Sequence, residues 1–483
     1  MIEKTEASIE GALTLGRTVI TLDHAVRVVR ERFFQIRVGG KVFIGDREAP
    51  DIVEALMPVD SFKVFFKTED IEGKDPLHIW LRSTDRIRFT GFTFDPAKPY
   101  GDAGSQFNLF QGPAIKPVEG DCKLIIDHID EVWCSSDSKQ STHVLDWLAH
   151  SFQKPWERTV TSIVLQSGEG TGKSIIMRML QEMWAPHSLQ IESENQIAGN
   201  HNDHLAQNML VCAEEFSMRG KIAATDVIKN FVSSKTLLIN PKGKSAFTVN
   251  NYARLIYATN HPWALQASKE ARRWYVAVIS SHRVGDFDYF AKLARVADSQ
   301  AGQSAFLYFL LNRDISAFDP QQRPDTKALD RQKRQTMDKL DHPLAWLAVV
   351  LESGEFELEK RPGGLYRSQS WRDDKAVLAD VLRESYEYFV VKKKNPPRWP
   401  NVAKRLKEIW PELDHIRIRV DGGERKYHYN LPPIEDARGA FESYAGLVLE
   451  PLPDDYSVDD CSIFDPNNKK ITNIHNHDQK RLA

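Results

Sequence analysis

Residues 162–174 read SIVLQSGEGTGKS, and this combination of an apolar run, a glycine-rich turn and a Lys-Ser pair constrains the fold more than any other segment. The run from Ile163 to Leu165 predicts a buried strand, and the apolar residues from Ser174 to Leu180 predict the first turns of a helix. Glycines in such a turn let backbone N–H groups point inward around phosphate oxygens, and the following helix adds the positive end of its dipole. The segment therefore predicts a P-loop, which is a turn that binds the phosphates of a nucleotide.

The predicted P-loop supplies both phosphate and metal ligands. Its cofactor-binding residues are Gly168, Glu169, Gly170, Thr171, Gly172, Lys173 and Ser174. Lys173 is expected to reach the outer phosphates of ATP, and Ser174 is expected to ligate Mg²⁺. The usual opening glycine of the motif is replaced by Ser167. A chance glycine-rich turn is the alternative, but the strand, the loop, the Lys-Ser pair and the helix all favour the P-loop.

A second predicted strand, Met209 to Ala213, ends in two acidic residues. Hydrolysis of ATP requires one carboxylate that orients the shell of the Mg²⁺ ion and another that positions the attacking water. Glu214 suits the first role, as a metal ligand beside Ser174, and Glu215 suits the second. A strand that runs into a solvated acidic turn is the alternative interpretation.

A third predicted strand, Leu255 to Thr259, is followed by Asn260. In an AAA+ architecture, a polar residue at this strand tip contacts the γ-phosphate and the attacking water, so Asn260 is the expected sensor. Arg272 and Arg273 come next, and an arginine that reaches a neighbouring subunit's nucleotide stabilises charge in the transition state. The alternatives are a plain turn at Asn260 and a surface arginine pair.

Composition excludes several classes of protein but does not indicate an activity. A length of 483 residues predicts two to four domains, and a net charge of -3 requires any nucleic-acid surface to be local. The four cysteines form no CxxC pair, which argues against a zinc ribbon and a disulfide scaffold. No run approaches the roughly 18 apolar residues of a membrane span, so we expect a cytoplasmic protein without a membrane partner.

The predicted fold class is α/β, with a P-loop AAA+ ATPase core, an N-terminal α+β domain and a C-terminal winged-helix-like domain. In the N-terminal domain, residues 41–44 and 62–66 are strand-like runs, and no catalytic constellation appears. The expected divisions are an α+β domain at 1–118, a helical collar at 119–160, the ATPase domain at 161–300, a helical lid and linker at 301–370, a winged-helix-like domain at 371–445 and a disordered tail at 446–483.

Basic residues concentrate near the C-terminus. Residues 391–407 hold seven basic side chains and no acidic one. Helices are predicted at 377–390 and 402–410, followed by a two-stranded hairpin, and this order looks like a winged helix. The candidate DNA-binding residues in this region are Lys392, Lys393, Lys394, Arg398, Lys404, Arg405, Arg417 and Arg419. A basic lid with a structural role is the alternative.

The motifs together resemble superfamily 3 helicases, and more closely the helicase part of phage and mobile-element primase-helicases. The matching text is WLAHSFQKPWERTVTSIVLQSGEGTGKS, LVCAEE, VIKNFVSSKTLLINPKGK, NNYARLIYATNHP and ARRWYV. The resemblance implies an AAA+ hexamer that pulls single-stranded DNA through a central pore, moving 3' to 5'. It also implies that Lys242 and Lys244 lie in a pore hairpin contacting the DNA backbone, for which a solvated turn is the alternative.

The same resemblance assigns the other roles. Lys173 and Ser174 bind phosphate and Mg²⁺, Glu214 and Glu215 form the acidic pair, Asn260 is the sensor, and Arg272 or Arg273 is the arginine finger. Glu214 departs from the family pattern, because aspartate is more usual there. The sequence before the predicted motor has neither a zinc-ligand set nor a paired-aspartate core, so we expect no priming activity from it.

The preferred hypothesis is a replicative DNA helicase of a phage, prophage or satellite element, with ATP and Mg²⁺ as cofactors. Its expected partners are single-stranded DNA, origin duplex DNA, further copies of the chain in a hexamer and a separate primase. The alternatives are an initiator or loader ATPase that does not unwind DNA, and a P-loop kinase or switch GTPase. The histidine pairs His201 with His204 and His475 with His477 have ligand-like spacing, but we interpret them as satisfied or solvent-exposed side chains.

Overall fold

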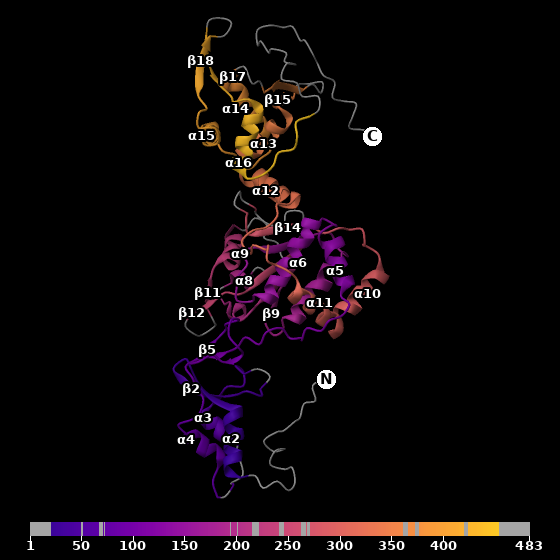
Figure 1. Cartoon of the computed structure of the whole chain (residues 1–483). Helices are drawn as coiled ribbons and strands as arrows, with labels where there is room; N and C mark the ends of the chain where they lie inside the picture. Colours follow the sequence, from indigo (N-terminus) through magenta and orange to yellow (C-terminus); the bar gives the residue numbers. More distant parts are fainter. Residues whose placement is uncertain are drawn as a thin grey trace.

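The structure is a computed structural model that describes residues 21–49, 52–66, 71, 73–193, 195–199, 201–214, 222–240, 246–261, 267, 271–360, 366–371, 376–419 and 424–453. Figure 1 shows three bodies in a row. We call them the N-terminal body (21–109), the central body (110–340) and the C-terminal body (342–453). Within the described ranges, no helix combines the length and the apolar character that crossing a membrane requires.

The N-terminal body packs helices on one face of a small sheet. Its elements are α2 (Leu22–Arg32), β1 (Phe33–Val38), β2 (Lys41–Asp46), β3 (Met57–Pro58), α3 (Val59–Phe65), α4 (Pro76–Arg82) and β4 (Arg88–Phe89), with sheet order β3-β2-β1-β4. A second sheet has the order β5-β7-β6 and is formed by β5 (Phe92–Thr93), β6 (Gly101–Asp102) and β7 (Phe107–Asn108). Adjacent residues of β1 point to opposite faces, so Phe33 packs toward the helices and Phe34 toward the second sheet.

The strand predicted at 62–66 is wrong, because this segment lies almost entirely in helix α3. Phe62 and Phe66 are four residues apart, so the helix brings both rings onto the ring of Phe33, at 4.9 and 5.0 Å between centroids. Val64 and Phe65 point away and are exposed. Five apolar or amphipathic residues in a row resemble a buried strand, and only the tertiary packing reveals the helical face.

The central body is built on a parallel sheet of five strands. They are β8 (Ser162–Gln166), β9 (Ser188–Ile191), β10 (Leu210–Glu214), β13 (Arg254–Thr259) and β14 (Trp274–Val278), in the order β14-β8-β13-β10-β9. The three strands predicted around the chemical motifs are β8, β13 and β10, and they are neighbours at the centre of the sheet. Both faces are buried, as parallel sheets require.

Helices cover both faces of this sheet. On one face lie α5 (Lys123–His128), the π-helical turn η1 (Ile129–Trp133), α6 (Ser138–Gln153), α7 (Lys173–Met183), α10 (Phe287–Ala297) and α11 (Gln300–Asn312). On the other face lie α8 (Asn195–Ala198), α9 (Ile222–Ser233) and α12 (Lys327–Leu340), with the short helix η2 (Asp203–Leu205) nearby in the chain. Trp147 of α6, Ile163 of β8 and Leu310 of α11 share one core. The expected boundaries at 160 and 300 therefore pass through a single packed unit.

The C-terminal body has its own core. Its elements are α13 (His342–Ser353), β15 (Glu355–Lys360), β16 (Tyr366–Ser370), β17 (Val377–Leu378), α14 (Ala379–Val390), α15 (Trp399–Ile409), β18 (His415–Arg419), β19 (Arg425–Tyr429) and α16 (Ile434–Ala445). Strands β15 and β16 form an antiparallel pair, and a separate sheet has the order β17-β19-β18. The core runs from Leu344 to Leu449, so it begins before residue 371 and extends past residue 446. Residues 454–483 of the expected tail lie outside the described residues.

Candidate functional site

The glycine loop, residues 167–172, joins β8 to α7 at the carboxyl edge of the central sheet. Gly170 and Gly172 have φ angles of 72° and 79°, in the left-handed region that favours glycine. A Cβ atom at Gly172 would lie 2.4 Å from Cε1 of Phe290 and 3.0 Å from Cε1 of His128. Both conformation and space therefore require glycine at position 172. Helix α7 begins at Lys173 without a side-chain cap, which leaves its N-terminus open to an anion.

Lys173 is directed back across the loop. Its side chain is buried, and its ammonium group donates to Oδ1 of Asn260, to Oγ of Ser167 at 3.2 Å and to the carbonyl oxygen of Gly168 at 3.4 Å. Asn260 follows β13, the strand next to β8. The expected phosphate ligand and the expected sensor are therefore in direct contact.

Ser174 and Glu214 form the second contact of the site. The Ser174 hydroxyl donates to Oε2 of Glu214 at 2.8 Å. Glu214 is the last residue of β10, so its carboxylate stands at the same sheet edge as the glycine loop. A hydroxyl and a carboxylate are hard oxygen ligands of the kind that Mg²⁺ prefers. Glu215, the second expected acid, lies outside the described residues.

The topology places these residues at the point where the strand connections of the central sheet diverge. After β8 the chain crosses to β9 at one edge of the sheet, whereas after β13 it crosses to β14 at the opposite edge. In open parallel sheets, ligands bind outside the carboxyl ends of the strands at the point where the connections diverge. The glycine loop and Asn260 flank that point.

Arg272 and Arg273 lie at the opposite edge of the sheet. They precede Trp274, the first residue of β14, which pairs with Ser162, the first residue of β8. Because β8 has five residues, the sheet separates the two edges by about 16 Å. Arg272 is exposed, whereas Nε of Arg273 is buried without a hydrogen-bond partner among the described residues. The pair does not lie beside the glycine loop of its own chain.

The segment expected to form a pore hairpin is enclosed by two strands. Strands β11 (Thr236–Ile239) and β12 (Phe247–Asn250) pair in antiparallel fashion, so the chain reverses between them. Lys242 and Lys244 fall between these strands and lie outside the described residues.

The basic residues of the C-terminal body divide into two groups. Arg405 contacts Oδ2 of Asp341 at 3.2 Å, Oε2 of Glu408 at 3.0 Å and the hydroxyl of Tyr444 at 2.9 Å. Lys393 pairs with Asp338 of α12. These two side chains hold elements of the protein together. The exposed group consists of Lys392, Lys394, Arg398, Lys404, Arg417 and Arg419.

The described histidine pair contacts backbone carbonyl oxygens. His204 contacts the carbonyl oxygen of Gln196 at 2.6 Å, and His201 contacts that of Asn240 at 3.4 Å. The described part of the chain holds no group of three His, Cys, Asp or Glu that could bind a metal ion. His475 and His477 lie outside it.

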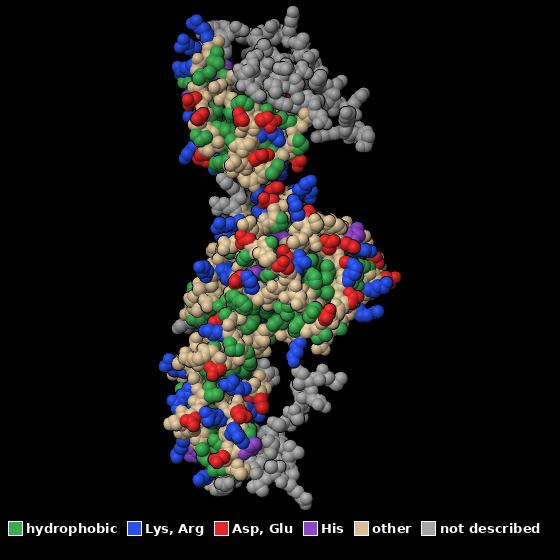
Figure 2. Space-filling model, in the orientation of Figure 1, with side chains coloured by type: hydrophobic (Ala, Val, Ile, Leu, Met, Phe, Trp, Pro, Cys, Tyr) green, Lys and Arg blue, Asp and Glu red, His purple; other side chains and the backbone are tan. Residues whose placement is uncertain are grey.

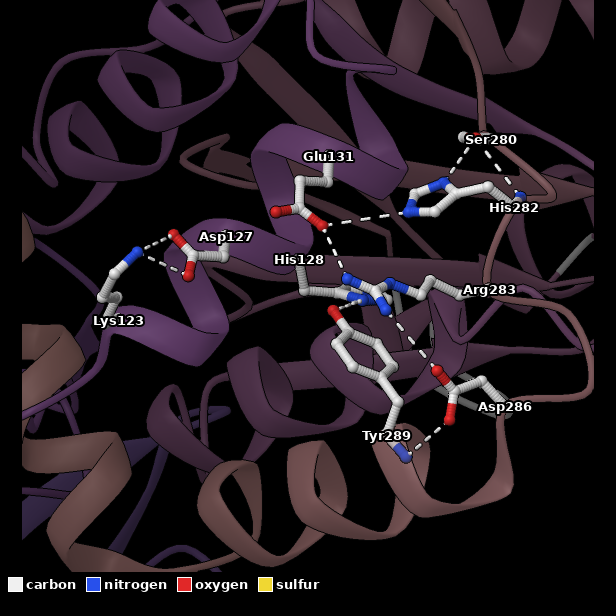
Figure 3. A network of polar contacts seen from close by, with 9 residues as sticks. All are labelled: Lys123, Asp127, His128, Glu131, Ser280, His282, Arg283, Asp286 and Tyr289. Carbon is white, nitrogen blue, oxygen red and sulfur yellow. Dashed lines mark hydrogen bonds and ion pairs between the residues drawn. The ribbon is translucent and has the colours of Figure 1, made fainter.

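The structure contains a polar network beside the glycine loop that the sequence analysis did not predict (Figure 3). The imidazole of His128 lies 3.0 Å from the hydroxyl of Tyr289, and burial lowers the pKa of His128 to about 4. Arg283 lies 3.1 Å from Oε2 of Glu131, and its guanidinium carbon is 4.5 Å from the centroid of the Tyr289 ring. These residues come from α5, η1 and the segment around the start of α10. No local spacing relates them, so no sequence motif could have indicated the network.

The chain resembles known proteins in sequence and in fold. Residues 165–273 match a family model described as "Family of unknown function (DUF5906)", and this range holds every catalytic candidate. The DNA Primase-polymerase of Nitratiruptor phage NrS-1 is 22% identical over 216 residues, which cover 43% of this chain and 29% of that protein. The chain thus spans less than a third of this curated relative.

Two solved structures extend the likeness. The apo structure of the NrS-1 C terminal region has a TM-score of 0.58 at 14% identity and covers 84% of this chain and 97% of that chain. The A form apo structure of the same region also has a TM-score of 0.58, at 13% identity, with coverage of 83% and 98%. At these identities the match shows a shared mixed α/β fold. The likeness to a phage DNA Primase-polymerase confirms the expected resemblance to phage proteins at this coarse level.

Proposed function

We propose that this chain is an ATP-dependent DNA helicase of the AAA+ superfamily 3 type that serves the replication of a phage, prophage or satellite element. The observation that carries the proposal is the convergence of Lys173, Ser174, Glu214 and Asn260 at one edge of a parallel sheet. These residues come from three separate segments of the chain and form two side-chain contacts. The likeness to a phage DNA primase-polymerase supports a role in replication.

The residues at this edge fit ATP and Mg²⁺. Gly170 and Gly172 adopt the backbone conformation that turns N–H groups toward a phosphate, and Lys173 supplies a positive charge. Ser174 and Glu214 supply oxygen ligands for Mg²⁺, which usually completes its shell with water and phosphate oxygens. When bound, ATP with Mg²⁺ supplies the phosphoanhydride bond whose hydrolysis drives movement. We assign the positioning of the attacking water to Glu215.

The arginine pair supports a site that is shared between subunits. Arg272 and Arg273 lie across the sheet from their own glycine loop, so an arginine finger from this chain serves a neighbouring copy. Exposure favours Arg272 over Arg273 for this role. This arrangement requires an assembly of several copies, and we propose a hexamer.

Two regions are proposed to contact DNA. The connection between β11 and β12, with Lys242 and Lys244, is proposed to contact single-stranded DNA in the central pore. Within the C-terminal body, the segment from β17 to β19 follows the order strand, two helices and hairpin, with β19 between β17 and β18, and this supports a winged helix that binds origin duplex DNA. A separate primase is the further partner that this function requires.

A fork-unwinding assay tests the proposal. ATP-dependent strand displacement on a fork with a 3' tail, with little on a 5' tail, is the expected result, and Lys173→Ala is expected to abolish it. ATP hydrolysis without displacement on either fork would favour the initiator or loader. Absence of DNA-stimulated ATP hydrolysis, with phosphate transferred to another acceptor, would favour a kinase.

A further inference from the structure

Strands β18 and β19 form an antiparallel ribbon at one end of the molecule (Figure 1). All five residues of β18 are exposed. Figure 2 shows Lys and Arg side chains gathered at this end, over β18. A ribbon of two strands gains little stability by itself, so the chemistry of its two faces indicates what it is for.

The register separates the side chains of the ribbon into two faces. Residues directly opposite each other in an antiparallel pair lie on the same face. One face, which we call the arginine face, carries Arg417 opposite Tyr427 and Arg419 opposite Arg425. The opposite face carries Ile416, Ile418, Lys426 and His428.

Burial of the ribbon is greatest at its base, where Tyr429 and His428 are buried on opposite faces. At the base of the ribbon, Tyr429 pairs with Val377, and both side chains are buried in the core of the C-terminal body. Tyr429 lies on the arginine face, because residues 425, 427 and 429 alternate along β19. Beyond the core, the arginine face thus turns basic and exposed, while the opposite face carries Ile416 and Ile418, which are also exposed.

Two arrangements on the arginine face favour an anionic partner. Arg419 and Arg425 stand directly opposite each other, and like charges in this position destabilise a sheet unless an anion neutralises them. The guanidinium carbon of Arg417 lies 4.5 Å from the centroid of the Tyr427 ring, and its NH2 group contacts the Tyr427 hydroxyl. Stacking fixes the direction of the Arg417 charge and covers the ring, so Tyr427 is poorly placed to stack on an unpaired base.

We infer that the arginine face binds the phosphate backbone of duplex DNA, through Arg417, Arg419 and Arg425. The inference rests on the proposed function, because it specifies how the proposed winged helix contacts its duplex. It adds the ribbon to the contact expected from α15, on which Lys404 is exposed whereas Arg405 is engaged by Asp341, Glu408 and Tyr444. Backbone contacts of this kind position a protein on DNA without reading its sequence.

Salt-dependent binding of the full-length chain tests the arginine face. We compare wild type, the double variant Arg417→Ala with Arg419→Ala, and Lys426→Ala, on a 30-base-pair duplex and on a single strand of oligothymidine. Each lost phosphate contact lowers the slope of log K against log salt by about 0.9 on duplex DNA. The double variant is expected to lose about 1.8 of slope on the duplex. Lys426→Ala removes one charge from the opposite face and is expected to leave the slope unchanged.

The remaining outcomes separate the inference from the function on which it rests. An unchanged duplex slope in the double variant, an equal loss in Lys426→Ala, or a loss confined to the single strand would overturn the inference while wild type still binds DNA. Failure of wild type to bind either probe would overturn the proposed function itself. Arg417→Lys with Arg419→Lys keeps the charges, so restored slope in this variant shows that loss of charge, and not unfolding, caused the effect.

Discussion

The hydroxyl of Ser174 lies 2.8 Å from Oε2 of Glu214, although 40 residues separate the two in sequence. Ser174 belongs to the first turn of α7 and Glu214 ends β10, and strand β13 lies between β8 and β10 in the sheet. Because a strand intervenes, the two side chains can make contact only if both lie at the same edge of the sheet. The predicted P-loop and the predicted acidic strand are therefore parts of one site.

Substitutions of Lys173 and of Glu215 are expected to separate binding from hydrolysis. Lys173→Ala removes the buried ammonium group beside Asn260 and is expected to abolish ATP binding. Glu215→Gln keeps the shape of the side chain but removes the charge that activates water, so binding should persist while turnover stops. Fluorescent-nucleotide titration and phosphate release measure the two effects. Turnover above roughly a tenth of wild type in Glu215→Gln contradicts the assigned role.

The glycine loop permits a test with a matched control. Gly172→Ala places a methyl group 2.4 Å from a ring carbon of Phe290 in a left-handed conformation, so the loop must distort and nucleotide affinity is expected to fall at least tenfold, or about 1.4 kcal/mol. Gly168→Ala meets no atom within 4 Å and is expected to bind nucleotide like wild type. Calorimetric titration with ATP compares them. Equal affinities in the two variants would mean that the loop does not hold the ligand.

Buried histidines are expected to make the central body sensitive to acid. Burial lowers the pKa of His187 to about 4. Its Nε2 accepts from the Gln111 N–H at 3.0 Å and its Nδ1 donates to the Gln207 carbonyl at 3.1 Å, which requires the neutral ring. The unfolded chain binds a proton near pH 6.5 while the folded chain resists it until about pH 4. The free energy of unfolding should therefore fall between these values, by at most about 1.4 kcal/mol per pH unit for this group.

His187→Gln removes this titration and is expected to make the pH dependence shallower. Three other buried histidines have pKa values lowered to about 4, so part of the dependence should remain; they are His128, His143 and His150. Hydrogen exchange of amides in β8 and α7 at pH 7, 6 and 5 measures the opening free energy of the central body. An identical slope in wild type and His187→Gln would show that His187 titrates normally in the folded chain.

Arg405 and its neighbour Lys404 are expected to have different roles. Arg405→Ala removes contacts to Asp341, Glu408 and Tyr444, and should destabilise the C-terminal body by about 1–2 kcal/mol. Lys404 is exposed, so Lys404→Ala should change stability by no more than about 0.5 kcal/mol. Thermal unfolding compares the two variants. A larger loss of stability in Lys404→Ala would contradict the structural role of Arg405.

Features that depend on residues close together in the chain were the most successfully predicted from the sequence. The strand, glycine loop and helix around Lys173 follow from a local pattern, and so do the helices and hairpin of the C-terminal body. The ion pair and the hydrogen bond that Arg405 forms with Asp341 and Tyr444 could not be predicted, because these residues are distant in the sequence. Helix α3 was mistaken for a strand because its apolar residues are consecutive, and only packing against Phe33 selects the helical face.

The position of the arginine pair leads to a test of the shared site. Arg272 and Arg273 stand about 16 Å from the sheet edge that carries their own glycine loop, so under the proposed function the arginine finger of each site comes from a neighbouring copy. An arginine finger changes turnover by about 10³-fold or more in comparable enzymes. Arg272→Ala is therefore expected to abolish ATP hydrolysis while ATP binding persists. Arg273→Ala serves as the matched comparison, because exposure favours Arg272.

Mixing inactive variants distinguishes a shared site from a site within one chain. Lys173→Ala and Arg272→Ala are each expected to be inactive, but their mixture recreates interfaces that pair an intact loop with an intact arginine. Some ATP hydrolysis should return, and wild-type activity should rise more steeply than linearly with protein concentration and with added single-stranded DNA. Sedimentation confirms that the variants assemble with wild type. If they assemble and the mixture stays inactive, or if a monomer hydrolyses ATP at the full rate, then the arginine does not complete a neighbour's site.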